Sequence, residues 1–331
     1  INHLAPIDGL RSFTSAFIDL NNDQWPDLAI TADFNDPIYL ANNNGLDFVA
    51  PSDNNIASSE INGMGAAFSD YDHDGDIDWF MTGIMPPEDS NRTEEGNHFY
   101  QNEQNNSFAQ KAVELGISES GWAWGTAFID FDNDGDMDLI TTAGIDIPYV
   151  HWGDFDEPWR NDPIRFWINN DGVFTESASK LGLTDRRQGK ALITFDYDND
   201  GDLDIFIVNN NDQPVLYRND SINNNDWIKI AVQGTVSNRD GIGAQVTIRY
   251  GENDAKQQYM EVMASGNFLG QNEKTLHFGL GQDAVNKQIS SLEIKWPSGI
   301  TQVITNVSIN QSLLIIEPNT PPDPDNDGIV S

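Results

Sequence analysis

Four short acidic segments recur along the first two-thirds of the chain, each between two runs of apolar residues. The segments read AFIDLNNDQWPDLAI, AFSDYDHDGDIDWFM, AFIDFDNDGDMDLIT and ITFDYDNDGDLDIFI, and their first aspartates are Asp19, Asp70, Asp130 and Asp196. These aspartates are separated by 51, 60 and 66 residues. Self-similarity at a period of this kind indicates a repeat architecture, in which one supersecondary unit packs on the next.

The repeated unit is longer than its acidic segment. Each segment is followed by an apolar run and then by a short aromatic run that ends in Asn, at residues 38–42, 99–102, 166–169 and 215–219. A further short run lies around Phe48, Phe108 and Phe174. Short β-branched or aromatic runs separated by Asn, Asp and Gly are typical of strands and turns. Each unit therefore predicts about four strands, as in the blade of a β-propeller.

The pattern changes after the fourth unit. The strand expected after Tyr217 is replaced by a run that begins at Trp227 and opens a different domain. Four blades alone would form a ring that lacks one strand, so we favour part of a larger ring, truncated at its N-terminal side. We expect an all-β chain with propeller-type blades over residues 1–225, a small β-sandwich-like domain over 226–317 and a Pro/Asp-rich linker over 318–331.

The acidic loops have the pattern of a calcium site. Calcium takes about six to eight hard oxygen ligands, and alternating aspartates in a turn direct several carboxylates at one centre. A glycine at position 6, such as Gly75, lets the chain turn back sharply. Position 7 is where a main-chain carbonyl is expected. The predicted metal-binding residues are Asp19, Asn21, Asp23 and Asp27; Asp70, Asp72, Asp74, Asp76 and Asp78; Asp130, Asp132, Asp134, Asp136 and Asp138; and Asp196, Asp198, Asp200, Asp202 and Asp204.

The first loop departs from this pattern, because Gln24 stands where the glycine is expected and Pro26 stiffens the exit. An EF-hand is excluded for the others. That motif needs a bidentate Glu at position 12 and flanking helices, whereas position 12 here is Met81, Thr141 or Ile207.

Composition supports a cation in these loops. Asp, Asn and Gly also form plain solvent-exposed turns, but three nearly identical loops would bring like charges within a few ångströms, and such charges repel strongly. The sequence predicts about three to four Ca²⁺ ions.

The formal charge of -36, from 17 basic and 53 acidic residues, argues against nucleic acid and anionic lipid as partners. No apolar run is long enough to insert into a membrane.

These loops resemble those of the FG-GAP/VCBS repeat family, known from integrin α-subunits and bacterial surface proteins, over roughly residues 1–225. From Trp227 onward the chain resembles the ASPIC/UnbV domain, on three motifs in order: Ser237–Ala244 (SNRDGIGA), His277–Gly281 (HFGLG) and Trp296–Gly299 (WPSG). The resemblance implies a seven-bladed propeller in full-length relatives, calcium in the blade loops and an extracellular setting, either secreted or on the bacterial cell surface.

An insertion at residues 145–167 is rich in aromatic and acidic residues. Long loops on a rigid scaffold often carry binding sites, and aromatic rings beside carboxylates suit sugars. Tyr149, Trp152 and Trp159 are therefore candidate ligand-binding residues, although packing within or between blades is the favoured interpretation. A further calcium-type motif starts with Asp323, Asp325, Asp327 and Gly328, close to the end of the sequence.

The sequence contains no G-x-S-x-G, no H-E-x-x-H and no complete phosphate loop, so nothing in it assigns an enzymatic activity. The favoured function is an extracellular calcium-binding repeat protein that adheres to, or binds, a protein or a polysaccharide. The alternatives are a propeller-type hydrolase or lyase acting on extracellular polysaccharide, and a structural spacer. An enzyme would show a deep pocket with converging carboxylates outside the calcium loops.

Overall fold

The computed structural model describes residues 11–33, 36–51, 56, 62–86, 96–104, 106–145 and 159–319. The regular structure of these residues is almost entirely β, as the alternating short apolar runs predict. No helix among them is long and apolar enough to cross a lipid bilayer.

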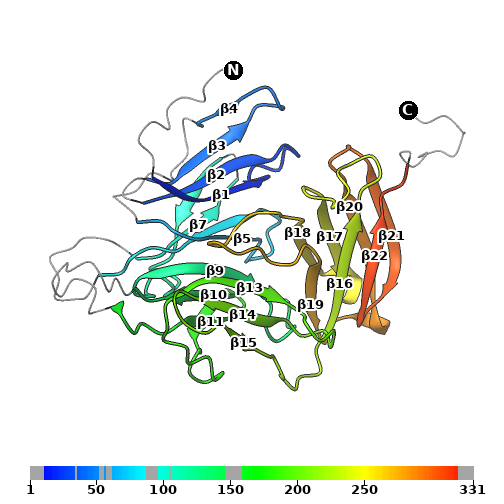
Figure 1. Ribbon diagram of the computed structural model, residues 1–331. Helices are drawn as coiled ribbons and strands as arrows, with labels where there is room; N and C mark the ends of the chain where they lie inside the picture. Colours follow the sequence, from blue (N-terminus) through cyan, green and yellow to red (C-terminus); the bar gives the residue numbers. More distant parts are fainter. Residues whose placement is uncertain are drawn as a thin grey trace, which may run out of the picture.

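The described residues up to Tyr217 form four antiparallel sheets, each a meander of neighbouring strands (Figure 1). The first sheet is β1 (Ser12–Ile18), β2 (Asp27–Ala32), β3 (Ile38–Asn42) and β4 (Phe48–Val49); the second is β5 (Ala66–Ser69), β6 (Asp78–Met81), β7 (His98–Asn102) and β8 (Phe108–Gln110). The third is β9 (Ala123–Ile129), β10 (Asp138–Ala143), β11 (Arg165–Asn170) and β12 (Val173–Glu176), and the fourth is β13 (Gly189–Phe195), β14 (Asp204–Asn209) and β15 (Val215–Tyr217). These sheets confirm the predicted blades, and the fourth has three strands in the described residues.

Aromatic side chains pack successive blades together. Phe108, on the last strand of the second blade, lies 5.5 Å from Tyr39 of the first, measured between ring centroids. Phe174, on the last strand of the third blade, lies 6.2 Å from Tyr71 of the second. The recurring Phe of the second and third repeats thus joins its blade to the preceding one, because a large ring buries much apolar surface in one contact.

Residues from Asp226 onward form a second unit of two packed sheets. One has the order β19-β16-β22, with β16 and β22 parallel, and the other has the order β18-β17-β20-β21. Ile228, Ile230 and Phe278 of the first sheet pack against Val246 and other residues of the second in one core. The strands are β16 (Asp226–Gln233), β17 (Gln245–Tyr250), β18 (Lys256–Glu261), β19 (Leu276–Gly281), β20 (Gln288–Lys295), β21 (Thr301–Ser308) and β22 (Gln311–Ile316), with short 3-10 turns η2 (Glu252–Asp254) and η3 (Val285–Lys287). The sandwich-like arrangement agrees with the sequence prediction.

One asparagine connects the second unit to all four blades. Asn267 is buried in the connection between β18 and β19 and has a left-handed φ of 66°. Its carbonyl accepts a hydrogen bond from the Thr14 hydroxyl at 2.9 Å, and its Oδ1 accepts one from the Thr126 amide at 3.2 Å. Its own amide donates to the Ala66 carbonyl and its Nδ2 donates to the Leu192 carbonyl.

These four partners lie on or beside β1, β5, β9 and β13, the first strands of the four blades. A single side chain and its peptide groups therefore fix the first strands of the blades relative to one another. Each bond is buried, so breaking one would leave an unsatisfied polar group, at a cost of about 1–3 kcal/mol.

Glu317 joins two of the sequence motifs of the second unit. Its Oε2 accepts hydrogen bonds from the amides of Thr235, Val236 and Ser237 at 2.8, 2.8 and 2.7 Å. Its Oε1 accepts from the hydroxyls of Ser237 and Ser298 at 2.8 and 2.5 Å. Ser237 opens the SNRDGIGA motif and Ser298 lies in the WPSG motif, so one carboxylate explains why both carry a serine.

Replacing Glu317 by Gln should reduce the stability of this unit in a pH-dependent way. Burial raises the pKa of Glu317, but the hydrogen bonds from Ser298, Ser237 and Thr235 outweigh it and lower the pKa to about 2. A carboxyl group with a lowered pKa in the folded state stabilises the fold above its unfolded pKa, and this stability is lost as the pH falls. The wild-type protein should therefore lose unfolding free energy between about pH 4.5 and pH 2.

Urea unfolding across this pH range measures the effect. Glu317→Gln should be less stable than the wild type at pH 7 and should lose less stability on acidification. The exposed Glu252→Gln variant serves as control. A Glu317→Gln protein whose acid profile coincides with that of the wild type would refute this role for the carboxylate.

Candidate metal centres

Each acidic loop joins the first strand of a blade to the second, and the aspartate at position 9 begins that second strand. In the third loop, Asp138 Oδ2 accepts a hydrogen bond from the Phe131 amide at 3.0 Å, and its Oδ1 accepts one from the Asn169 amide at 2.8 Å. The same two bonds recur at Asp27 from Leu20 and Asn42, at Asp78 from Tyr71 and Asn102, and at Asp204 from Tyr197 and Asn219. The Asn at or near the end of the third strand of each repeat therefore holds the loop in place.

All four loops follow the same backbone path. Position 4 is left-handed in each, with φ of 60° to 61° at Asn22, His73, Asn133 and Asn199. Position 6 is also left-handed, with φ of 91° to 99° at the glycines of the later three loops and 69° at Gln24. The first loop thus adopts the glycine conformation without a glycine, which costs a residue with a Cβ some backbone strain.

The second and third loops each leave one buried carboxylate oxygen without a hydrogen-bond partner. In both, Oδ2 of the first aspartate accepts from the glycine amide, at 3.1 Å for Asp70 and 3.0 Å for Asp130. Oδ1 of Asp70 and of Asp130 is buried and has no partner among the described residues. An unpaired buried carboxylate oxygen is costly, and a cation would satisfy it.

Further carboxylates surround these oxygens. Three sets of side chains bring ligand atoms within 4.8 Å of one another: Asp70, Asp72 and Asp78; Asp130, Asp132 and Asp134; and Asp196, Asp198 and Asp204. The donors are all hard oxygens, which suits Ca²⁺ or Mg²⁺ better than a soft transition metal.

The second unit supplies polar partners to the aspartates of the first and fourth loops. Gln245 Nε2 donates to Asp19 Oδ2 at 2.7 Å, while the amide of Asp19 donates to Glu261 Oε2 at 3.2 Å. Lys229 Nζ lies 3.2 Å from Asp196 Oδ2, with both side chains buried. A protein cation already offsets some of the charge at Asp196, so the middle two loops have the greater need for a metal ion.

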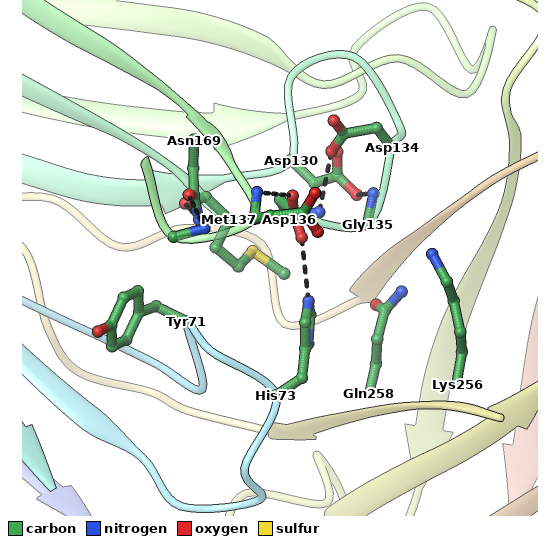
Figure 2. Close-up of polar contacts among 12 residues, drawn as sticks. Tyr71, His73, Asp130, Asp134, Gly135, Asp136, Met137, Asn169, Lys256 and Gln258 are labelled. Atoms are coloured by element: carbon green, nitrogen blue, oxygen red, sulfur yellow. Dashed lines mark hydrogen bonds and ion pairs between the residues drawn. The ribbon is translucent and has the colours of Figure 1, made fainter. Parts of the chain in front are cut away.

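The position-7 side chains connect neighbouring loops. His73 Nε2 lies 3.3 Å from Asp136 Oδ1, and Figure 2 shows the ring directed at that carboxylate. Asn133 Nδ2 donates to Asp202 Oδ1 at 2.7 Å, and Asn22 makes the equivalent bond to Asp76. These carboxylates therefore contact the preceding loop, and the main-chain carbonyl of position 7 remains the ligand expected from the sequence.

Burial and crowding raise the pKa values of the loop carboxyl groups. Burial, with contributions from Asp74 and Asp72, raises the pKa of Asp70 to about 7, although His73 opposes the shift. Burial raises the pKa of Asp134 to about 6 and holds that of Asp130 well above its ordinary value. The metal-free loops thus resist full ionisation, and a divalent cation would reverse that tendency.

Comparisons with known proteins match both parts of the chain. The FG-GAP-like repeat family matches residues 19–81 and 89–141, and the ASPIC and UnbV family matches residues 234–322. The chain carries FG-GAP-like repeats and an ASPIC/UnbV domain. The sequence resemblance to both families is thereby confirmed.

Two curated relatives have the same name, cartilage acidic protein 1. The mouse protein is 24% identical over 275 residues, covering 67% of this chain and 41% of its own length. The human protein is 24% identical over 278 residues, covering 67% of this chain and 40% of its own length. The chain thus spans about two-fifths of the length of these relatives.

The HFGLG motif of the ASPIC/UnbV domain docks on the third FG-GAP loop. Burial lowers the pKa of His277 to about 3, so the ring is neutral, and its Nε2 lies 2.6 Å from Asn133 Oδ1. The amide of Gly281 donates to the Asn133 carbonyl at 2.8 Å. A Cβ at Gly279 would collide with Asp130 Oδ2, so this glycine is what allows the strand to approach the loop.

Trp159, a candidate ligand residue of the insertion, is only 3% exposed. Its ring lies 5.3 Å from that of Trp122 in an edge-to-face arrangement, and its Nε1 donates to the Met85 carbonyl at 2.8 Å. This position favours packing, the interpretation preferred from the sequence, over contact with a sugar. Tyr149, Trp152 and the motif from Asp323 to Gly328 lie outside the described residues.

The raised carboxyl pKa values predict an unusual pH dependence for the metal-free protein. A carboxyl group with a raised pKa in the folded state stabilises the fold at low pH, and this stability is lost as the pH rises through the folded pKa. For Asp134 and Asp70 these folded values are about 6 and about 7. Metal-free protein should therefore melt at a lower temperature at about pH 8 than at about pH 5.

Calorimetric melting in chelator and in saturating calcium tests this. Calcium should stabilise the protein far more at the higher pH, where the carboxylates are ionised. An equal calcium effect at both pH values would contradict the assignment of the shifted groups to the metal centres.

Proposed function

We propose that this chain is an extracellular calcium-binding repeat protein, in which the ions fix the FG-GAP loops and the assembled scaffold binds a polysaccharide or protein ligand. The observation that carries the calcium assignment is the pair of buried, unpartnered Oδ1 atoms of Asp70 and Asp130. Each belongs to a set of three aspartates with converging oxygens. Asp70, Asp72 and Asp78 would hold one ion, and Asp130, Asp132 and Asp134 a second.

Calcium would have a structural role in this arrangement. It would offset like charges within a loop and fix the loop against which the next blade and the ASPIC/UnbV domain pack. The fourth loop, at Asp196, Asp198 and Asp204, is the candidate for a third ion, and the first loop for a fourth.

The extracellular setting and the ligand-binding role rest on separate support. The two relatives have names that place them in cartilage and describe them as acidic, and this chain has a formal charge of -36. A rigid β-scaffold with loops gathered beside a second domain is a common arrangement for recognition. Adhesion to a polysaccharide or protein outside the cell is the function that these features favour.

Isothermal titration with CaCl₂ tests the metal assignment. The wild type should bind about three to four ions. The dissociation constants should lie in the range of about 10⁻⁴ to 10⁻³ M that is typical of extracellular modules, or somewhat below it. At a free calcium concentration of about 100 times the dissociation constant, each site should contribute about 2.7 kcal/mol to stability.

The Asp130→Asn variant should lose one binding event and part of the calcium-induced rise in melting temperature. Asp254→Asn removes the same charge from an exposed turn outside the loops and should bind calcium like the wild type. Identical isotherms for Asp130→Asn and the wild type would reject the third loop as a calcium site.

A further inference from the structure

One face of the second sheet of the ASPIC/UnbV domain is polar in a regular grid. The register pairs Arg249 with Gln257 on β18 and Ser291 on β20, and it pairs Thr247 with Tyr259 and Glu293 in the same way. A third row pairs Gln245 with Glu261 and Lys295. Side chains at alternate positions of a strand share a face, so these nine residues lie together, opposite the face whose Val246 and Ile248 enter the core.

Only part of this polar face is covered. Its third row docks on the first FG-GAP loop, through the bonds of Gln245 and Glu261 to Asp19. All of these nine residues except Glu261 line a cavity of about 300 Å³, whose lining also includes Asn22 of the first loop and Gly75 of the second. This volume is at the lower end of the range for small-molecule sites, which suits a short ligand or the end of a chain.

One buried polar group in this lining lacks a partner. The Tyr259 side chain lines the cavity and is 8% exposed, and its hydroxyl has no hydrogen-bond partner among the described residues. A buried hydroxyl that forms no hydrogen bond is unfavourable, so it requires a partner such as a water molecule, an ion or a ligand group. A phenol both donates and accepts, which matches the hydroxyl groups of a saccharide.

The charges of the lining complement an anion. Arg249 and Lys295 contribute two positive charges to the cavity and Glu293 one negative charge, in a chain with a formal charge of -36. Two cations against one carboxylate in the lining favour a ligand with a single negative group over a neutral one, while the overall charge repels a dense polyanion. Arg249 has the planar fork that pairs best with a carboxylate.

The neutral lining suits hydroxyl groups. Gln257, Thr247, Ser291 and Tyr259 offer amide and hydroxyl donors and acceptors side by side. We propose that this interdomain cleft binds a short saccharide that carries one carboxylate, that is, a uronic acid residue or the uronate end of an extracellular polysaccharide. The proposal rests on the proposed ligand-binding function and names the class of its ligand.

Saturation-transfer NMR titration of the calcium-loaded protein with methyl β-glucuronide tests this, with methyl β-glucoside as the matched neutral probe. The glucuronide should bind saturably and about tenfold more tightly than the glucoside, because an Arg–carboxylate pair contributes about that factor. Equal binding of the two probes, or no saturable binding of the glucuronide, would overturn the proposal.

Two variants locate the site. Arg249→Gln should weaken glucuronide binding about tenfold, whereas Arg239→Gln, an exposed substitution on the same domain, should leave it unchanged. Tyr259→Phe removes the unpartnered hydroxyl, so its melting temperature should not fall while its affinity for the glucuronide does. Wild-type affinity in Arg249→Gln would show that these cations serve only to offset the neighbouring acidic loops.

Calcium-induced melting shifts are measured on the same samples. Glucuronide binding without a calcium effect would reject the calcium assignment and keep the cleft. A calcium effect without glucuronide binding would reject the cleft alone.

Discussion

The aspartates of each acidic loop repel one another, and the fold has to hold them together. The loop backbone turns left-handed at positions 4 and 6 and brings buried carboxylates together, and backbone amides satisfy some of their oxygens. Oδ1 of Asp70 and of Asp130 has no such partner. Hydrogen bonds orient these groups but do not neutralise them, and we propose that a cation completes the loop. Neighbouring loops and the ASPIC/UnbV domain contact these loops, so their positions depend on the loop conformation.

The blades and the second unit form one assembly at these loops. His277 and Gly279 lie against the third loop, Lys229 against the fourth and Gln245 against the first. Asn267 reaches the first strand of every blade, so the ASPIC/UnbV domain also orders the blades relative to one another. This arrangement gives the HFGLG motif a physical role, since a larger residue at Gly279 would separate the domain from the loop it contacts.

The sequence predicts the local part of this architecture well. Alternating apolar runs, the recurring Phe and the Asp-Gly pattern indicate the strands, the blades and the candidate ligands, because each signal lies within one repeat. The contacts between distant segments leave no such signal. Asn267 is 75 residues from Leu192 and 253 residues from Thr14 along the chain. Glu317 is about 80 residues from the amides that donate hydrogen bonds to it. The left-handed φ of Gln24 also escapes prediction, because neighbouring structure imposes on it a conformation that its own side chain disfavours.

We propose that cations complete the second and third loops. Long-wavelength anomalous diffraction from crystals grown in calcium measures this most directly, since it locates the ions and identifies the element. Anomalous peaks are expected within about 2.3 to 2.6 Å of Asp70 Oδ1 and Asp130 Oδ1, with the carboxylates of Asp72, Asp78, Asp132 and Asp134 around them. Well-ordered loops in calcium with no peak at either oxygen, or with only water there, would contradict it.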